Sequence, residues 1–111
     1  MTIEFIDNKN KFFSDVKTLG RKNSATLGFM PDGGFEDHAK NGCIIVAQDG
    51  KVLAGYLMYR VVFRLSRVSI VHLCVSEDYR GKGVPTALLK ALKKKYEKIY
   101  RGISLSCRTD F

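Results

Sequence analysis

The stretch VHLCVSEDYRGKGVPTALLKALKKKYEKIYRG, residues 71–102, contains the transition that decides the fold. An apolar run ends at Val75, a short polar turn with two glycines follows, and an amphipathic segment begins next to Pro85. Proline is favoured in the first turn of a helix, because its missing N–H deletes no helix hydrogen bond there. We therefore predict a strand, a glycine turn and a helix, in that order.

The turn Arg80-Gly81-Lys82-Gly83 has the composition of an anion-binding turn. Backbone N–H groups at a helix N-terminus face anions with the positive end of the helix dipole. Glycine permits close backbone approach to a ligand, and the two basic residues add charge. Two other phosphate motifs are excluded, since no Gly-Lys-Ser/Thr occurs and the segment GKGVPT lacks the third glycine of a dinucleotide fingerprint. We predict that the turn binds a diphosphate.

The rest of the pattern predicts an α/β fold with a mixed sheet. Strands are expected at residues 2–7, in a hairpin over 43–64 that turns at Asp49-Gly50, at 68–75 and at 102–107. Helices are expected at 11–19 with Gly20 as C-terminal cap, near 35–40, and after Gly83. Strands 68–75 and 102–107 flank the last helix, so they are predicted to be parallel neighbours, and 68–75 to be covered on both faces.

Composition indicates one domain, residues 1–111. No apolar run approaches the ~20 residues of a membrane span, and the N-terminus lacks the pattern of a signal peptide, so a cytoplasmic location is expected. Cys43, Cys74 and Cys107 form no CxxC pair, which predicts reduced thiols and no metal site. The net charge of +8, concentrated in residues 80–101, favours an anionic ligand. A nucleic acid is not expected, because no aromatic-rich strand accompanies the charge.

The segment LCVSEDYRGKGVPTALLKAL resembles the acetyl-CoA motif of the GNAT N-acetyltransferase superfamily, Arg/Gln-x-x-Gly-x-Gly/Ala. Arg80 and Gly83 match fixed positions of that motif, and the order of the predicted elements agrees with the fold. The resemblance implies an acetyl-CoA-dependent enzyme that moves an acetyl group to a small-molecule or protein amine by direct attack.

The resemblance also implies how the co-substrate acetyl-CoA is held. The pantetheine arm would pair with the strand backbone at Leu73 and Val75, and strands 68–75 and 102–107 would splay to leave a slot for the thioester. The pyrophosphate would bind the backbone amides of Arg80, Gly81, Lys82, Gly83, Val84 and Thr86.

Two departures from the family pattern are evident. Pro85 stands where the family has Gly or Ala, which removes one N–H from the phosphate site. The chain ends after the fifth predicted strand, whereas a typical member continues with a further helix and two strands. We therefore expect a short member, a fragment, or a homodimer that pairs at the edge formed by residues 103–107. The alternative function is a non-catalytic module of the same fold that binds coenzyme A or another partner.

Candidate catalytic groups are few. His72 has a pKa range suited to a general base, but a packed strand histidine is the alternative, and a bulge would change its face. We place Cys74 on the opposite face from His72, so it is not expected to be an activated nucleophile. Glu36, Asp37 and His38 either line an amine pocket or form a solvated helix face.

Overall fold

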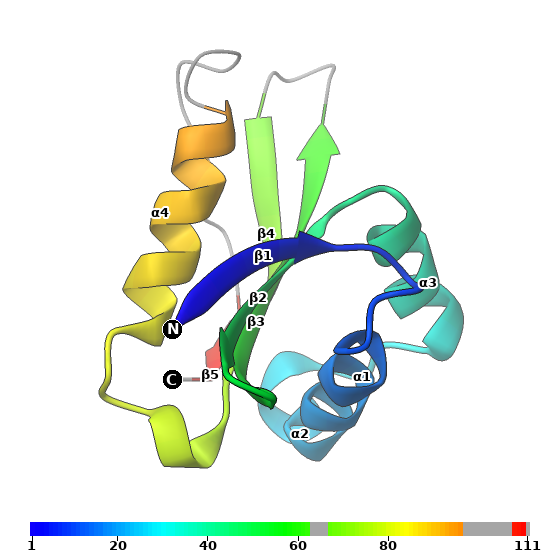
Figure 1. Cartoon of the computed structure of the whole chain (residues 1–111). Coiled ribbons are helices and arrows are strands. Elements are labelled where there is room, and N and C mark those ends of the chain that lie inside the picture. Colours follow the sequence, from blue (N-terminus) through cyan, green and yellow to red (C-terminus); the bar gives the residue numbers. More distant parts are fainter. Residues whose placement is uncertain (63–66, 97–107, 111) are drawn as a thin grey trace.

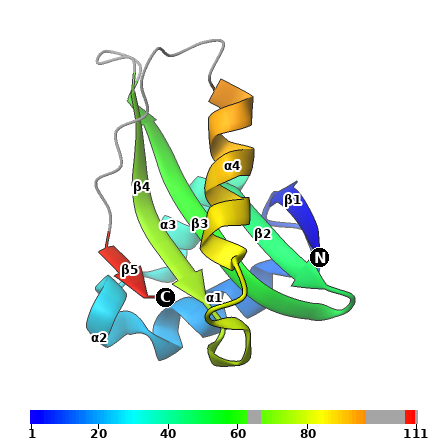
Figure 2. The same ribbon diagram turned by 90° about the vertical axis from the view of Figure 1, so that its left-hand side faces the viewer.

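The computed structural model describes residues 1–62, 67–96 and 108–110. Three layers are visible, with α4 on one side of a single sheet and α1, α2 and α3 on the other (Figures 1 and 2). The elements in chain order are β1 (Thr2–Ile6), α1 (Phe13–Lys22), α2 (Ser24–Leu27), α3 (Asp32–Lys40), β2 (Ile44–Asp49), β3 (Val52–Val62), β4 (Arg67–Val75), the 3-10 helix η2 (Glu77–Tyr79), α4 (Val84–Tyr96) and β5 (Arg108–Asp110). The prediction of an α/β fold with a mixed sheet is confirmed.

The sheet has the strand order β1-β2-β3-β4-β5. Its first four strands pair antiparallel, and β4 pairs with β5 in parallel. The predicted hairpin is confirmed as β2 and β3, and Gly50 in its turn has a φ of 62°, a conformation that glycine adopts without strain. The strand and dimer edge predicted within residues 102–107 lie outside the described residues.

A bulge in β4 sets which side chains face α4. Met58 of β3 pairs with His72, but Tyr59 pairs with Ile70, so β4 contains one extra residue, Val71. In a regular strand Ile70 and Leu73 would point to opposite faces, because side chains alternate. With the bulge, both belong to the core under α4.

Two apolar cores lie on the two faces of the sheet. Residues Val84, Leu88 and Leu92 form the buried stripe of α4 against one face. The other core joins α1 and α3 to the sheet through residues such as Phe35 and Tyr56. β4 contributes side chains to both cores, so it is covered on both faces, as predicted.

The N-terminal helices differ from their predicted bounds. α1 continues through Gly20 to Lys22, so the prediction of Gly20 as a helix cap was wrong. Gly20 is required by packing instead, since a Cβ there would lie 2.6 Å from Tyr56 Oη and 2.8 Å from Phe35 Cζ. α3 begins at Asp32, earlier than expected, and α2 forms where no helix was predicted. Glycine in a sequence usually predicts the end of a helix, whereas Gly20 lies inside α1 and two further glycines lie inside α3.

Replacement of Gly20 by alanine is expected to lower the free energy of unfolding by about 1–3 kcal/mol, because the added methyl overpacks the contact with Tyr56 and Phe35. Gly33→Ala is the matched control, since Gly33 is exposed in α3 and a Cβ there meets nothing within 4 Å. The control is expected to be neutral or stabilising. Urea denaturation measures both, and equal effects of the two substitutions would contradict the packing role.

Candidate functional site

The turn between η2 and α4 has the backbone conformation that its glycines predict. Gly81 has a φ of 76° and Gly83 a φ of 79°, values that cost other L-residues roughly 1–2 kcal/mol. A Cβ at either position would meet nothing within 4 Å. The glycines are therefore required by the handedness of the backbone rather than by crowding within the protein, and the space over the turn is open.

Unpaired N–H groups gather at this turn. Within residues 1–62, 67–96 and 108–110, no acceptor pairs with the backbone N–H of Gly81, Lys82, Gly83, Val84 or Thr86. The N–H of Ala87 donates to the Gly83 carbonyl at 3.1 Å and so begins the helix ladder. The N–H of Arg80 donates to the Glu77 carbonyl at 3.4 Å. Every amide predicted for the pyrophosphate except that of Arg80 thus remains available to a ligand, at the positive end of α4.

Pro85 lies in the first turn of α4, directly after Val84. This position is confirmed as one where the ring breaks no helix hydrogen bond. The row of donors consequently has one gap, between the N–H groups of Val84 and Thr86.

The approach to the turn is braced against the hairpin. Tyr79 Oη donates to Asp49 Oδ2 at 2.9 Å, and this hydrogen bond raises the pKa of the Tyr79 hydroxyl, which remains a donor. The ammonium of Lys82 lies 5.6 Å from the centre of the Tyr79 ring. Before Tyr79 in the chain, the Ser76 N–H donates to the Ala54 carbonyl at 2.8 Å. These contacts attach the segment before the turn to the ends of β2 and β3.

Arg80 turns its guanidinium back toward the sheet. Its Nε donates to the Val75 carbonyl at 3.3 Å, and its Nη2 donates to Asn23 Oδ1 at 3.4 Å. The sequence alone suggested that the charge of Arg80 faces the anion. Both of these hydrogen bonds instead join the turn to the end of β4 and to the segment between α1 and α2.

A close contact that the sequence did not reveal holds α4 against the sheet. A Cβ on Gly55 of β3 would lie 2.8 Å from the Cys74 carbonyl oxygen and 3.0 Å from Val84 Cγ1. Only glycine admits the first residue of α4 at this distance. Glycine inside a strand is the signal that could have predicted such an approach.

At the end of β4, Leu73 is paired with Thr109 and Cys74 with Asp110 of β5. Val75 follows this ladder, and its carbonyl accepts the Arg80 bond described above. The pairing of pantetheine with Leu73 and Val75 stays a prediction. The slot expected between residues 68–75 and 102–107 depends on residues outside those described.

His72 lies in the core that α1 and α3 cover. Its side chain is 3% exposed, and its Nδ1 is 3.1 Å from Tyr56 Oη. Burial, followed by the charge of nearby His38, lowers the pKa of His72 from 6.5 to about 4. The imidazole is therefore neutral near pH 7 and packs against Phe35, the arrangement of the packed alternative.

The expected relation between His72 and Cys74 was wrong. Residues two apart in a strand share a face, and both side chains point toward the N-terminal helices. Cys74 is buried in the same core as Tyr56, the partner of His72, and its Sγ accepts a hydrogen bond from Asn23 at 3.3 Å.

The acidic segment of α3 is not brought to the turn. Figures 1 and 2 both place α3 away from η2 and the first turn of α4. Glu36 Oε2 accepts a hydrogen bond from Asn8 at 3.0 Å, and His38 Nδ1 is 2.7 Å from the Gly34 carbonyl. These contacts tie Glu36 and His38 to their own surroundings.

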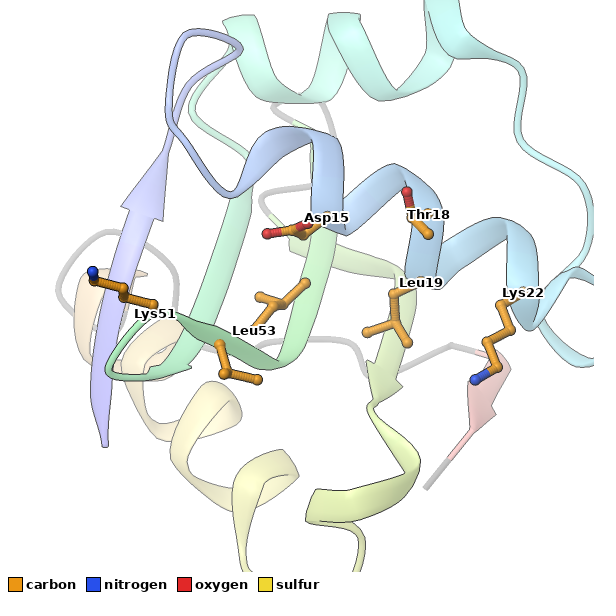
Figure 3. A pocket seen from close by; sticks show the side chains of 7 residues that line it. Asp15, Thr18, Leu19, Lys22, Lys51 and Leu53 are labelled. Carbon is orange, nitrogen blue, oxygen red and sulfur yellow. The ribbon is translucent and has the colours of Figure 1, made fainter.

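A separate open pocket of about 370 Å³ lies between α1 and the start of β3 (Figure 3). Leu19 and Leu53, one from each element, contribute apolar side chains to its lining, together with charged side chains of both signs (Figure 3). The complete lining is Asp15, Thr18, Leu19, Lys22, Lys51, Val52 and Leu53. No sequence pattern pointed to this pocket, because it joins segments that are far apart in the chain.

The family model described as "Acetyltransferase (GNAT) family" matches residues 11–110. The chain therefore belongs to the GNAT acetyltransferase family, as its motif and fold indicated. Acetyl transfer is accordingly supported at the level of the family. No sequence among the curated proteins matches the chain significantly.

Solved structures show the same fold. The ribosomal-protein-alanine N-acetyltransferase from Brucella melitensis biovar Abortus 2308 is similar with a TM-score of 0.76 and 18% identity over 96% of this chain and 79% of that one. N-acetylglutamate synthase from Neisseria gonorrhoeae, complexed with coenzyme A and N-acetyl-glutamate, is similar with a TM-score of 0.78 and 20% identity, over 94% of this chain and 24% of that one. A protein from Staphylococcus aureus subsp. aureus that is assigned to the GNAT acetyltransferases is similar with a TM-score of 0.71 and 16% identity. The match covers 96% of this chain and 100% of that one.

Within the described part of the chain, no group of three or more His, Cys, Asp or Glu side chains is arranged to hold a metal ion. None of the described helices is long and apolar enough to cross a membrane.

The low pKa of His72 predicts a pH-dependent stability. Between about pH 6.5 and pH 4 the unfolded chain binds a proton at this histidine and the folded chain does not. The free energy of unfolding therefore falls as the pH is lowered through this window, by up to about 3 kcal/mol, and this group adds no further loss below about pH 4. Denaturant titrations at pH 7 and pH 4.5 measure the loss. His72→Gln, which does not titrate, should lose less, and equal losses would contradict the assignment.

Proposed function

We propose that this chain is an N-acetyltransferase that uses acetyl-CoA, and that its glycine turn and the first turn of α4 bind the coenzyme A pyrophosphate. The observation that carries the proposal is the set of unpaired N–H groups from Gly81 to Thr86 at the N-terminus of a helix. Such a site stabilises a diphosphate without a metal or a specific side chain. Family membership supports the identity of the ligand.

The proposed reaction is direct attack by a neutral amine on the thioester carbonyl carbon. The C–N bond forms, the C–S bond breaks, the amine gives up a proton and the coenzyme A thiolate takes one. A backbone N–H on β4 near Val75 would stabilise the negative charge on the carbonyl oxygen in the transition state. The acceptor is proposed to be a small-molecule or protein amine. The similar structures bear the names of an enzyme for a ribosomal protein alanine and of aminoglycoside acetyltransferases.

We further propose that residues 1–111 act as a single cytoplasmic domain. The second candidate function is a module that binds coenzyme A without catalysis. Two observations favour it, the donor missing at Pro85 and the burial of His72 in the core. Both candidates share the coenzyme A site and differ in turnover.

Titration calorimetry of acetyl-CoA into the purified protein tests the shared site. Micromolar affinity, well above that for ATP as a control anion, is expected because the pantetheine arm adds contacts that ATP lacks. Absent binding, or equal binding of both ligands, would contradict the proposal. A thiol-release assay with a panel of amines then separates the candidates, since binding without any turnover supports the module.

Gly83→Ala is expected to weaken acetyl-CoA binding at least about tenfold, because alanine disfavours the positive φ that directs the N–H groups outward. Gly42→Ala is the matched control. Gly42 has a φ of 70° and equally open surroundings, but it follows α3, away from the turn. Both substitutions should cost similar stability, and only the first should reduce affinity. A comparable loss of affinity in both variants would contradict the site.

The role of His72 is tested by His72→Gln. A general base would lower kcat at least about 100-fold on removal. A packed histidine would leave kcat within a few fold, while the loss of its hydrogen bond to Tyr56 lowers the free energy of unfolding by about 1–3 kcal/mol. We expect the second outcome, because the ring is 3% exposed on the face away from α4. A loss in kcat of at least about 100-fold with unchanged stability would instead identify His72 as the general base.

A further inference from the structure

Asn23 occupies the junction of α1 and α2. Its backbone N–H donates to the carbonyls of Leu19 and Gly20, each at 3.3 Å, and so ends α1. Its own carbonyl accepts from the N–H groups of Thr26 and Leu27, at 3.1 Å and 3.0 Å, and so begins α2. The residue is therefore fixed in place by its backbone before its side chain makes any contact.

The side-chain amide of Asn23 uses both of its ends. Nδ2 donates to the Leu19 carbonyl at 3.0 Å and to Cys74 Sγ at 3.3 Å, while Oδ1 accepts from Arg80 Nη2 at 3.4 Å. This orientation is the one that satisfies all three contacts, since a carbonyl only accepts and a guanidinium only donates. One amide thus connects α1, the buried strand β4 and the first residue of the glycine turn.

A second contact of the Arg80 guanidinium extends this connection. Its Nε donates to the Val75 carbonyl at the end of β4. The guanidinium therefore spans from the strand end to the α1–α2 junction and restrains the residue from which the turn departs. The N–H groups of Gly81 to Thr86 follow directly along the chain.

We propose that Asn23 is a positioning residue for coenzyme A. It acts through Arg80, whose side chain it holds against the end of β4, so that the donors of the turn are arranged before the ligand arrives. Preorganisation of this kind increases affinity because less conformational freedom is lost on binding. The proposal rests on the proposed function in that coenzyme A is taken as the ligand.

A double-mutant cycle on acetyl-CoA affinity tests the connection. Asn23→Ala is expected to weaken binding about fivefold, the ratio that corresponds to the loss of one hydrogen bond. In an Arg80→Ala background the same substitution should change affinity by less than about twofold, because the partner through which it acts is gone. A structural role at the helix junction would give the same factor in both backgrounds and would overturn the proposal.

Two variants sharpen this comparison. Asn23→Asp keeps an acceptor for Arg80 but loses both donations of Nδ2, so it should lower the melting temperature while affinity stays within about twofold of wild type. Asn41→Ala is the matched control, since Asn41 likewise follows a helix, α3, and its side chain makes no hydrogen bond among the described residues. It should leave affinity unchanged. Loss of affinity in Asn23→Asp as large as in Asn23→Ala would count against the contact with Arg80.

Hydrogen exchange separates failure of this proposal from failure of the proposed function. Asn23→Ala should speed amide exchange at Tyr79, Arg80 and Ala87, the hydrogen-bonded amides on either side of the open donors, and leave the β2–β3 hairpin unchanged, whether or not wild type binds acetyl-CoA. If wild type does not bind but the turn exchanges faster in the variant, the proposed ligand is wrong and Asn23 still positions the turn. Unchanged exchange at Tyr79, Arg80 and Ala87 would overturn the positioning role itself.

Discussion

Val84, the first residue of α4, packs against β3 at Gly55, where a Cβ would approach the Cys74 carbonyl to 2.8 Å. This contact fixes the height of the helix N-terminus above the sheet, and the rest of the arrangement follows from it. The turn must reverse direction within a few residues to reach Val84, which requires positive φ at Gly81 and Gly83. The reversal leaves the N–H groups of Gly81, Lys82 and Gly83 without partners among the described residues.

Much of this site could be predicted because its signals are local. Glycines, a proline in the first helical turn and a preceding apolar strand are all contained in residues 71–102. β4 and the β2–β3 hairpin were predicted for the same reason, since alternation and Asp49-Gly50 are short-range patterns. The rest depends on contacts between distant segments. Gly20 lies inside α1 because Tyr56 and Phe35 pack against it, and the sequence around Gly20 does not show this contact.

The bulge at Val71 likewise depends on contacts between segments that are distant in the sequence. It is a property of the pairing of β3 with β4, and it sets the faces of His72 and Leu73. Arg80 was correctly placed in the turn, but two of its hydrogen-bond partners lie at the end of β4 and 57 positions away in the chain. Sequence therefore predicted the backbone of the candidate site, whereas the structure was needed to show which side chains support that backbone.

The use of backbone donors in the turn has a consequence for sequence divergence. An N–H group is present at every residue except proline, so Lys82 and Thr86 can be replaced by any other residue without removing a donor. Selection then acts on backbone handedness at the two glycines and on the absence of a side chain at Gly55. The fold is accordingly shared with the Brucella enzyme at only 18% sequence identity.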